Sequence, residues 1–146
     1  MSNVKIFNNF KIHTQYSICE GAIKIDDLAN YCKEKKVRNI GICDSYNLCG
    51  ALEFAEKVSK SGTQPIIGTQ INFILEGVLG RLPLFSTTSV GYKNLIKLSS
   101  KSYLESDEKN DPHCKISDLK IIQKDLILLS GNHYGLFGKL FKLNKL

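Results

Sequence analysis

The chain has 146 residues and a formal net charge of +6, with 42% hydrophobic and 23% charged residues. These values are typical of one soluble globular domain with its own core, and the lack of any run of about 18 apolar residues excludes a transmembrane helix. The basic excess is mild, so it permits a polyanionic partner without requiring one. Because the first residues lack the apolar stretch of a signal peptide, we expect a cytoplasmic protein without a membrane partner.

The cysteines are odd in number and form no Cys-x-x-Cys pair. In a reducing compartment this pattern favours free thiols, several of them buried as small hydrophobic residues. The five positions are Cys19, Cys32, Cys43, Cys49 and Cys114.

Apolar segments alternate with amphipathic helical patterns in the first half of the chain. Residues 10–13 and 39–43 predict two strands, the second of them buried. Between them, apolar residues at i, i+3, i+4 and i+7 from Ile25 predict a helix with acidic residues in its first turn and lysines in its last. A second helix is predicted from about Leu48 to the Ser-Gly pair at 61–62.

The second half continues with apolar strand patterns separated by turn and helix signals. The predicted segments are, in chain order, a strand at 65–73, a turn at 76–80, a strand at 82–85, a helix from Ser89 through Tyr103, a polar surface loop at 105–115, a strand at 126–129 and a last helix from Leu136.

Strand–helix alternation of this kind predicts an α/β fold with a parallel sheet. In such folds, catalytic and binding residues gather at the carboxyl ends of the strands. Polar residues at or just after the predicted strand ends are therefore candidates for a functional site: His13, Asp44, Gln70, Ser86 and Asn132.

Five stretches of the chain have a specific order and spacing. The first three are Lys-Ile-His-Thr-Gln-Tyr-Ser followed by Glu-Gly-Ala (11–22), Ile-Gly-Ile-Cys-Asp-Ser-Tyr-Asn-Leu-Cys-Gly-Ala (40–51) and Gln-Pro-Ile-Ile-Gly-Thr-Gln (64–70). Gly-Tyr-Lys-Asn-Leu (91–95) and Leu-Leu-Ser-Gly (128–131) follow. Together they resemble, over nearly the whole chain, the PHP (polymerase and histidinol phosphatase) domain at the N-terminus of the bacterial DNA polymerase III alpha subunit.

The resemblance implies a distorted (β/α) barrel with mainly parallel strands. A closed barrel of this kind needs about 250 residues. We therefore expect residues 1–146 to be the N-terminal portion of a single, incomplete PHP domain, forming part of the barrel in a truncated chain.

Metal-binding PHP domains hold several divalent ions, which activate water and neutralise charge on a phosphoryl group. The resemblance implies that only two of the expected ligand types remain here, namely the second His of a His-x-His motif and the Asp of an Asp-His motif. The relic site is Lys11 in place of His, His13, Asp44, Ser45 in place of His, Gln70 in place of Glu, Arg81 near an expected His, and Asn132 where Cys is often found.

The cationic replacements predict an inactive and metal-free site. The charges of Lys11 and Arg81 would repel a divalent ion and could pair with Asp44 instead. His13 and Asp44 remain weak metal candidates, because a lone histidine is more often a hydrogen-bonded structural residue and Asp44 is well placed to cap the following helix. Two tyrosines that follow the relic motifs, Tyr16 and Tyr46, either line the pocket or pack against its walls.

The resemblance implies a non-catalytic scaffold domain of a DNA-directed DNA polymerase, a nucleotidyltransferase of DNA replication. The parent protein would use Mg²⁺ through carboxylates outside this chain, which itself needs no cofactor. Its implied partners are the remainder of the alpha subunit, the proofreading exonuclease subunit and DNA.

Two other functions remain open. A stand-alone PHP phosphoesterase would hydrolyse phosphate esters with Zn²⁺ or Mn²⁺, but the loss of the first His and the presence of Ser45 and Gln70 argue against it. A small basic nucleic-acid-binding module is supported by net charge alone.

Overall fold

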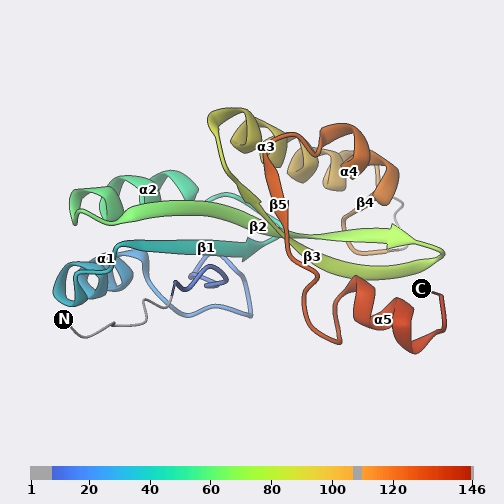
Figure 1. Cartoon of the computed structure of the whole chain (residues 1–146), viewed down its shortest axis with the longest axis horizontal. Helices are drawn as coiled ribbons and strands as arrows, with labels where there is room; N and C mark the ends of the chain where they lie inside the picture. The colour runs from blue at the N-terminus through green and yellow to red at the C-terminus, as the bar shows by residue number, and fades with distance from the viewer. Residues whose placement is uncertain (1–7, 107–109, 146) are drawn as a thin grey trace, which may run out of the picture.

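The computed structural model describes residues 8–106 and 110–145, and it has an α/β fold in which one five-stranded sheet is accompanied by helices (Figure 1). None of the helices in the described part of the chain is long and apolar enough to cross a membrane. In chain order the elements are α1 (Ile25–Lys35), β1 (Asn39–Ser45), α2 (Ala51–Lys60), β2 (Gln64–Leu75), β3 (Val78–Ser86), α3 (Ser89–Leu104), β4 (His113–Lys115), α4 (Ile116–Ile122), β5 (Leu126–Leu128) and α5 (Leu136–Lys142).

The sheet is mixed, so the expectation of mainly parallel strands is not confirmed. Strand β2 pairs in parallel with β1 and β4, whereas β3 pairs antiparallel with both β2 and β5. The cause is the turn at Glu76 and Gly77, where φ is 52° and 73°. Two successive residues with positive φ make the tight turn that joins antiparallel strands. The described strands follow an open path, and a barrel is likewise not confirmed.

Two predicted segments differ from the structure. Residues 10–13 form no regular strand among the described residues, because only Ile12 makes an isolated parallel bridge, to Ile42. The predicted loop at 105–115 ends in β4, which pairs with the second half of β2 beyond the end of β1. Burial explains this strand, since Cys114 is only 2% exposed and removing it from water stabilises the pairing.

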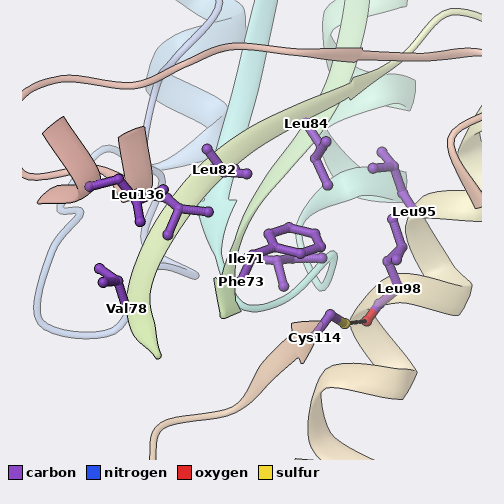
Figure 2. Close-up of a cluster of buried hydrophobic side chains, with 10 residues drawn as sticks. Ile71, Phe73, Val78, Leu82, Leu84, Leu95, Leu98, Cys114 and Leu136 are labelled. Carbon is purple, nitrogen blue, oxygen red and sulfur yellow. Dashed lines mark hydrogen bonds between the residues drawn. The ribbon is translucent and has the colours of Figure 1, made fainter. Parts of the chain in front are cut away.

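The larger core cluster lies between the β2–β3 hairpin and helices α3 and α5 (Figure 2). Alternate residues of β3 point into it, as expected for a strand with one buried face. Burying each large apolar side chain contributes about 1.5–3 kcal/mol to stability. The cluster comprises Ile71, Phe73, Val78, Leu82, Leu84, Leu95, Leu98, Cys114, Leu136 and Leu140.

A second core cluster joins α1 and α2 to β1 and fixes the segment that precedes α1. Backbone bonds tie this segment to β1, from Gly41 N to Asn9 O (2.8 Å) and from Cys43 N to Ile12 O (2.8 Å). A Cβ atom at Gly41 would lie 2.7 Å from the carbonyl oxygen of Phe10, so the close approach requires glycine. The pairing brings residues 11–22, called the first motif below, beside the carboxyl end of β1.

All five cysteines are free thiols, as predicted. Cys32, Cys43 and Cys114 are buried, whereas Cys19 and Cys49 are exposed. Burial raises the pKa of the Cys43 and Cys114 thiols to about 12, so both stay protonated and behave as small apolar residues.

Candidate functional site

Asp44 lies near the carboxyl end of β1 and is only 1% exposed. Its Oδ1 accepts hydrogen bonds from Thr14 N (2.6 Å) and Ser17 Oγ (2.6 Å), and its Oδ2 accepts from Thr14 Oγ1 (2.7 Å). Three donors thus satisfy the buried carboxylate, as burial of a charge requires. Asp44 therefore fastens the first motif to the sheet.

The interpretation of Asp44 as a helix cap is wrong. Helix α2 begins at Ala51 after Gly50, which provides no side-chain cap. Asn47 instead organises the turn before the helix, because its Oδ1 accepts a bond from Cys49 N (3.0 Å). The carboxylate of Asp44 is bonded instead to Thr14 and Ser17 of the first motif.

Arg81 on β3 pairs with Glu20 of the first motif. Its Nη1 donates to Glu20 Oε1 and its Nε donates to the hydroxyl of Tyr46 (2.8 Å), while the guanidinium carbon lies 5.0 Å from the centre of the Tyr46 ring. The predicted pairing of Arg81 with Asp44 is therefore wrong, because Asp44 already has three donors of its own.

The pairing changes the pKa of both partners. Burial pushes the pKa of Glu20 up, but hydrogen bonds from Ser45 and Arg81 outweigh it and leave the pKa below its ordinary value. Burial pushes the pKa of Arg81 down, but the hydrogen bonds and electrostatic interactions with Glu20 and Tyr46 together outweigh it and leave the pKa raised. Both groups are therefore held in their charged forms.

Ser45 and Gln70 complete a hydrogen-bond network around Glu20. Ser45 Oγ donates to Glu20 Oε2 (2.5 Å), and Gln70 Nε2 donates to Ser45 Oγ (3.1 Å). Ser17 joins this network to Asp44, since its Oγ also accepts from Ser45 N (3.1 Å). The first motif, β1, β2 and β3 are thereby linked through polar side chains at one place.

His13 lies at the edge of this network. Its Nδ1 is 3.4 Å from Ser17 Oγ. Burial is the main cause that lowers the pKa of His13, and the charge of Lys11 lowers it further, against the opposing effects of Glu20 and Asp44. Lys11 itself makes no ion pair within residues 8–106 and 110–145, so its predicted pairing with Asp44 is also wrong.

A pocket of about 330 Å³ opens beside the network. Lys11, Gln70, Arg81 and Asn132 all line it, whereas the other predicted site residues do not. Asn132 belongs to the loop between β5 and α5, where its Oδ1 accepts a bond from Tyr134 N (2.9 Å). The pocket therefore places Lys11, Gln70 and Arg81 beside the loop between β5 and α5.

One predicted site residue at a strand end, Ser86, does not lie at the site. Because β3 runs antiparallel to β2, its first half, with Arg81, lies beside the site, and its end, with Ser86, lies farther back along the sheet. Ser86 Oγ donates to Ile67 O (3.2 Å) and takes no part in the network. The rule that collects strand ends at one edge holds for parallel strands only.

Three residues of the first motif carry bonds that the sequence did not assign, namely Thr14, Ser17 and Glu20. Tyr46 lines the pocket, but Tyr16 packs against α2 and donates to Glu53 (2.7 Å). The sequence feature that could have identified these residues is their position in the same motif as His13. Within the described residues, no group of three or more His, Cys, Asp and Glu side chains is arranged to hold a metal ion.

A solved structure of a putative metal-dependent phosphoesterase from Bifidobacterium adolescentis is similar to the chain at 17% identity and a TM-score of 0.48. The similarity covers 66% of this chain and 34% of that protein.

Sequence relatives match more extensively. The DNA polymerase III subunit alpha of Rickettsia bellii is 35% identical over 140 residues, and that of Buchnera aphidicola is 36% identical over 138 residues. These matches cover 95% and 91% of this chain but 12% of each relative, so the chain spans about one-eighth of their length. The family model of the PHP domain matches residues 9–145. The chain therefore belongs to the PHP domain family.

Proposed function

We propose that this chain is the N-terminal PHP segment of a bacterial replicative DNA polymerase and acts there as a non-catalytic scaffold with a degenerate metal site. The observation that supports this most directly is the ion pair between Arg81 and Glu20. Ser45 donates a hydrogen bond to the same carboxylate, and Gln70 donates one to Ser45. A guanidinium stands where a metal cluster would need anionic or neutral ligands.

The donor set does not fit a cluster of divalent ions. Such a site requires several free carboxylate, imidazole or thiolate ligands around one point. Both oxygens of Asp44 are engaged by Thr14 and Ser17, and Glu20 is neutralised by Arg81. Lys11 would add repulsion on the pocket side.

The network provides a cross-link in place of metals. It joins the first motif to three strands through Glu20, Ser17 and Asp44. Such a cross-link fixes the loop before α1 against the sheet, which is the task of a scaffold. We propose that further chain completes the distorted barrel around this sheet.

The function proposed for the parent protein is supported by its relatives, which are named DNA polymerase III subunit alpha. The parent would extend DNA by nucleotidyl transfer with Mg²⁺ held by carboxylates outside this chain. Its partners would be the rest of the alpha subunit, the proofreading exonuclease subunit and DNA, in the cytoplasm.

Metal analysis combined with a phosphatase assay tests the proposal. After equilibration with Zn²⁺ or Mn²⁺ and removal of free metal, the chain should retain no stoichiometric metal and hydrolyse no p-nitrophenyl phosphate. A variant with the implied ligands restored, Lys11→His, Ser45→His, Gln70→Glu and Arg81→His, should retain more metal than the wild type. Stoichiometric metal and hydrolysis by the unaltered chain would instead favour the phosphoesterase.

A further inference from the structure

Strand β5 forms an edge of the sheet. It pairs with β3 on one side, and no other strand of the described residues pairs with it. Thr87 N donates to Asp125 O (3.0 Å), and Leu129 N donates to Pro83 O (3.0 Å). Because hydrogen-bonded and non-hydrogen-bonded pairs alternate along antiparallel strands, these bonds turn the backbone groups of the odd-numbered residues of β5 towards β3. The N–H and C=O groups of Leu128 therefore face the open edge.

Apolar side chains beside this edge line a hollow on one face of the sheet. Ile127 is 52% exposed, and Phe10 and Leu129 are each 39% exposed. Together with the buried Phe85, whose ring centre lies 6.3 Å from that of Phe10, they line a hollow of about 370 Å³. None of the described residues that line this hollow is charged. The hollow therefore favours an apolar occupant.

The edge also lacks the charged side chains by which exposed strands commonly prevent pairing with another chain. From Leu126 through Gly138 the sequence contains no Asp, Glu, Lys or Arg. The whole chain has a net charge of +6, which makes two copies repel each other over most surfaces. Pairing at β5 would bring no like charges into contact, and an acidic or basic partner would find no opposite charge there. Charge therefore selects a second copy of the chain as the occupant.

We propose that two copies of this 146-residue chain associate by antiparallel pairing of β5 with β5, around a twofold axis at Leu128. The Leu128 N–H group of each copy would donate to the Leu128 C=O group of the other. Leu126 and Leu128 pack against the larger core cluster, so the alternate residues Ile127 and Leu129 lie on the opposite face. There, Ile127 of one copy would lie opposite Leu129 of the other, and apolar side chains from both copies would cover the two hollows.

The interface would be small, because β5 has only three residues. Small interfaces are typical of transient complexes, so the association should depend strongly on concentration. It does not depend on the proposed polymerase function. In a longer parent protein, further chain that covered β5 would exclude the second copy.

Analytical ultracentrifugation of the full chain over a range of concentrations tests the association. We expect a reversible equilibrium between monomer and dimer. Ile127→Lys should weaken it about tenfold or more, because it places like charges close together at the paired edges. Leu52→Lys, a similar substitution at an exposed position of α2, should leave the dissociation constant unchanged. Circular dichroism should show that both variants are folded.

Hydrogen exchange of the unaltered chain, followed by NMR, identifies the surface without any substitution. The Leu128 N–H group should exchange more slowly as the concentration rises, because it is bonded only in the dimer. The Ile127 N–H group faces Phe85 of β3 and is the internal control, whose exchange should change less. A chain that stays monomeric, a dimer that Ile127→Lys leaves intact, or Leu128 exchange that is independent of concentration would each overturn the proposal.

Discussion

Arg81 and Glu20 lie 61 residues apart in the chain and form an ion pair at the centre of the site. Arg81 is on β3, and Glu20 is in the loop before α1. Because Glu20 also accepts a bond from Ser45 at the end of β1, one carboxylate holds two strands and a loop together. This contact gives the relic site a structural role that can be measured without any assay of activity.

A double-mutant cycle measures the contact. Glu20→Gln and Arg81→Met should each destabilise the chain, and the coupling free energy should be about 1 kcal/mol, because both side chains remain partly exposed to water. Urea unfolding of the wild type, the single variants and the double variant provides the four values.

The control cycle uses Lys101 and Glu105, an ion pair at i and i+4 at the end of α3, in which Lys101 also lies 3.5 Å from Asp118 of α4. Its coupling should be smaller than that of Arg81 and Glu20. Equal couplings in the two cycles would mean that the contact at the site is an ordinary surface pair.

Asp44 should matter more for stability than its partly exposed neighbours. Asp44→Ala removes the acceptor of three bonds and leaves the buried donors of Thr14 and Ser17 unpaired. We expect a loss of about 3 kcal/mol in the free energy of unfolding. Asp27→Ala, at an exposed position of α1, should cost less than about 1 kcal/mol. A small loss at Asp44 would contradict its role as the anchor of the first motif.

The sequence located the site better than it assigned the contacts. His13, Asp44, Ser45 and Gln70 were placed at one end of the sheet, and they do lie close together there through Ser17 and Glu20. Electrostatic attraction alone favoured a pair between Arg81 and Asp44. That pair is absent because the backbone N–H of Thr14, a donor that carries no sequence signal, occupies the carboxylate.

Acidification should destabilise the chain through His13. Its folded-state pKa is lowered by burial and by Lys11, so the unfolded chain binds the proton more tightly. The stability from neutral His13 is present above the ordinary pKa of 6.5 and is lost as the pH falls from there through the folded-state pKa. Urea unfolding between about pH 8 and pH 5 should show this slope, and His13→Gln should reduce it.

Lys11→Gln provides the matched test, because it keeps the histidine and removes a neighbouring charge. NMR titration of the His13 ring should give a higher pKa in this variant than in the wild type. Glu20 does not affect this comparison. Because its pKa is lowered, the stability that it contributes is lost only as the pH falls below its ordinary pKa of 4.5. An unchanged His13 pKa would contradict an effect of the Lys11 charge on the histidine.

The fold was predictable where the signal was local and was missed where it depended on pairing. Periodicity located α1, α2 and α3, and apolar runs located β1, β2, β3 and β5. A turn at 76–80 was also predicted, yet the sheet as a whole was expected to be mainly parallel. A two-residue link can join only antiparallel neighbours, so loop length was the stronger signal.

Gly91 is a position where a helix requires glycine for packing. A Cβ atom there would lie 2.1 Å from the carbonyl oxygen of Asp125, in the turn before β5. Asn94 Nδ2 donates to Lys124 O (2.9 Å) and Thr88 Oγ1 donates to Asp125 Oδ2 (2.8 Å), so the start of α3 binds this turn. Gly91→Ala should therefore destabilise the chain by about 2 kcal/mol in urea unfolding.

In the control, the change in stability between glycine and alanine should have the opposite sign. Comparing alanine with glycine at Lys97, an exposed position of the same helix, should favour alanine by about 1 kcal/mol, which is the intrinsic helix preference. If alanine stabilised the chain at both positions, the close approach of α3 to Asp125 would be wrong.

The buried cysteines report on different parts of the fold, since Cys114 belongs to the core cluster around the β2–β3 hairpin, Cys32 to the cluster that joins α1 and α2 to β1, and Cys43 lies on β1. In the native chain, the thiol reagent DTNB should react quickly only with the exposed Cys19 and Cys49, because burial raises the pKa of the other thiols and excludes the reagent. Cys43 and Cys114 should react only when the structure around each of them opens. Rapid reaction of either buried thiol would contradict the packing.

Combining this assay with Asp44→Ala separates a local from a global role of the network. Cys43 directly precedes Asp44 on β1, whereas Cys114 belongs to the core cluster around the β2–β3 hairpin. If the network holds the end of β1, the substitution should accelerate labelling of Cys43 more than labelling of Cys114, because local opening needs less free energy than global unfolding. Equal acceleration at both thiols would mean that β1 and the core cluster around the β2–β3 hairpin open together and that Asp44 stabilises the domain as a whole.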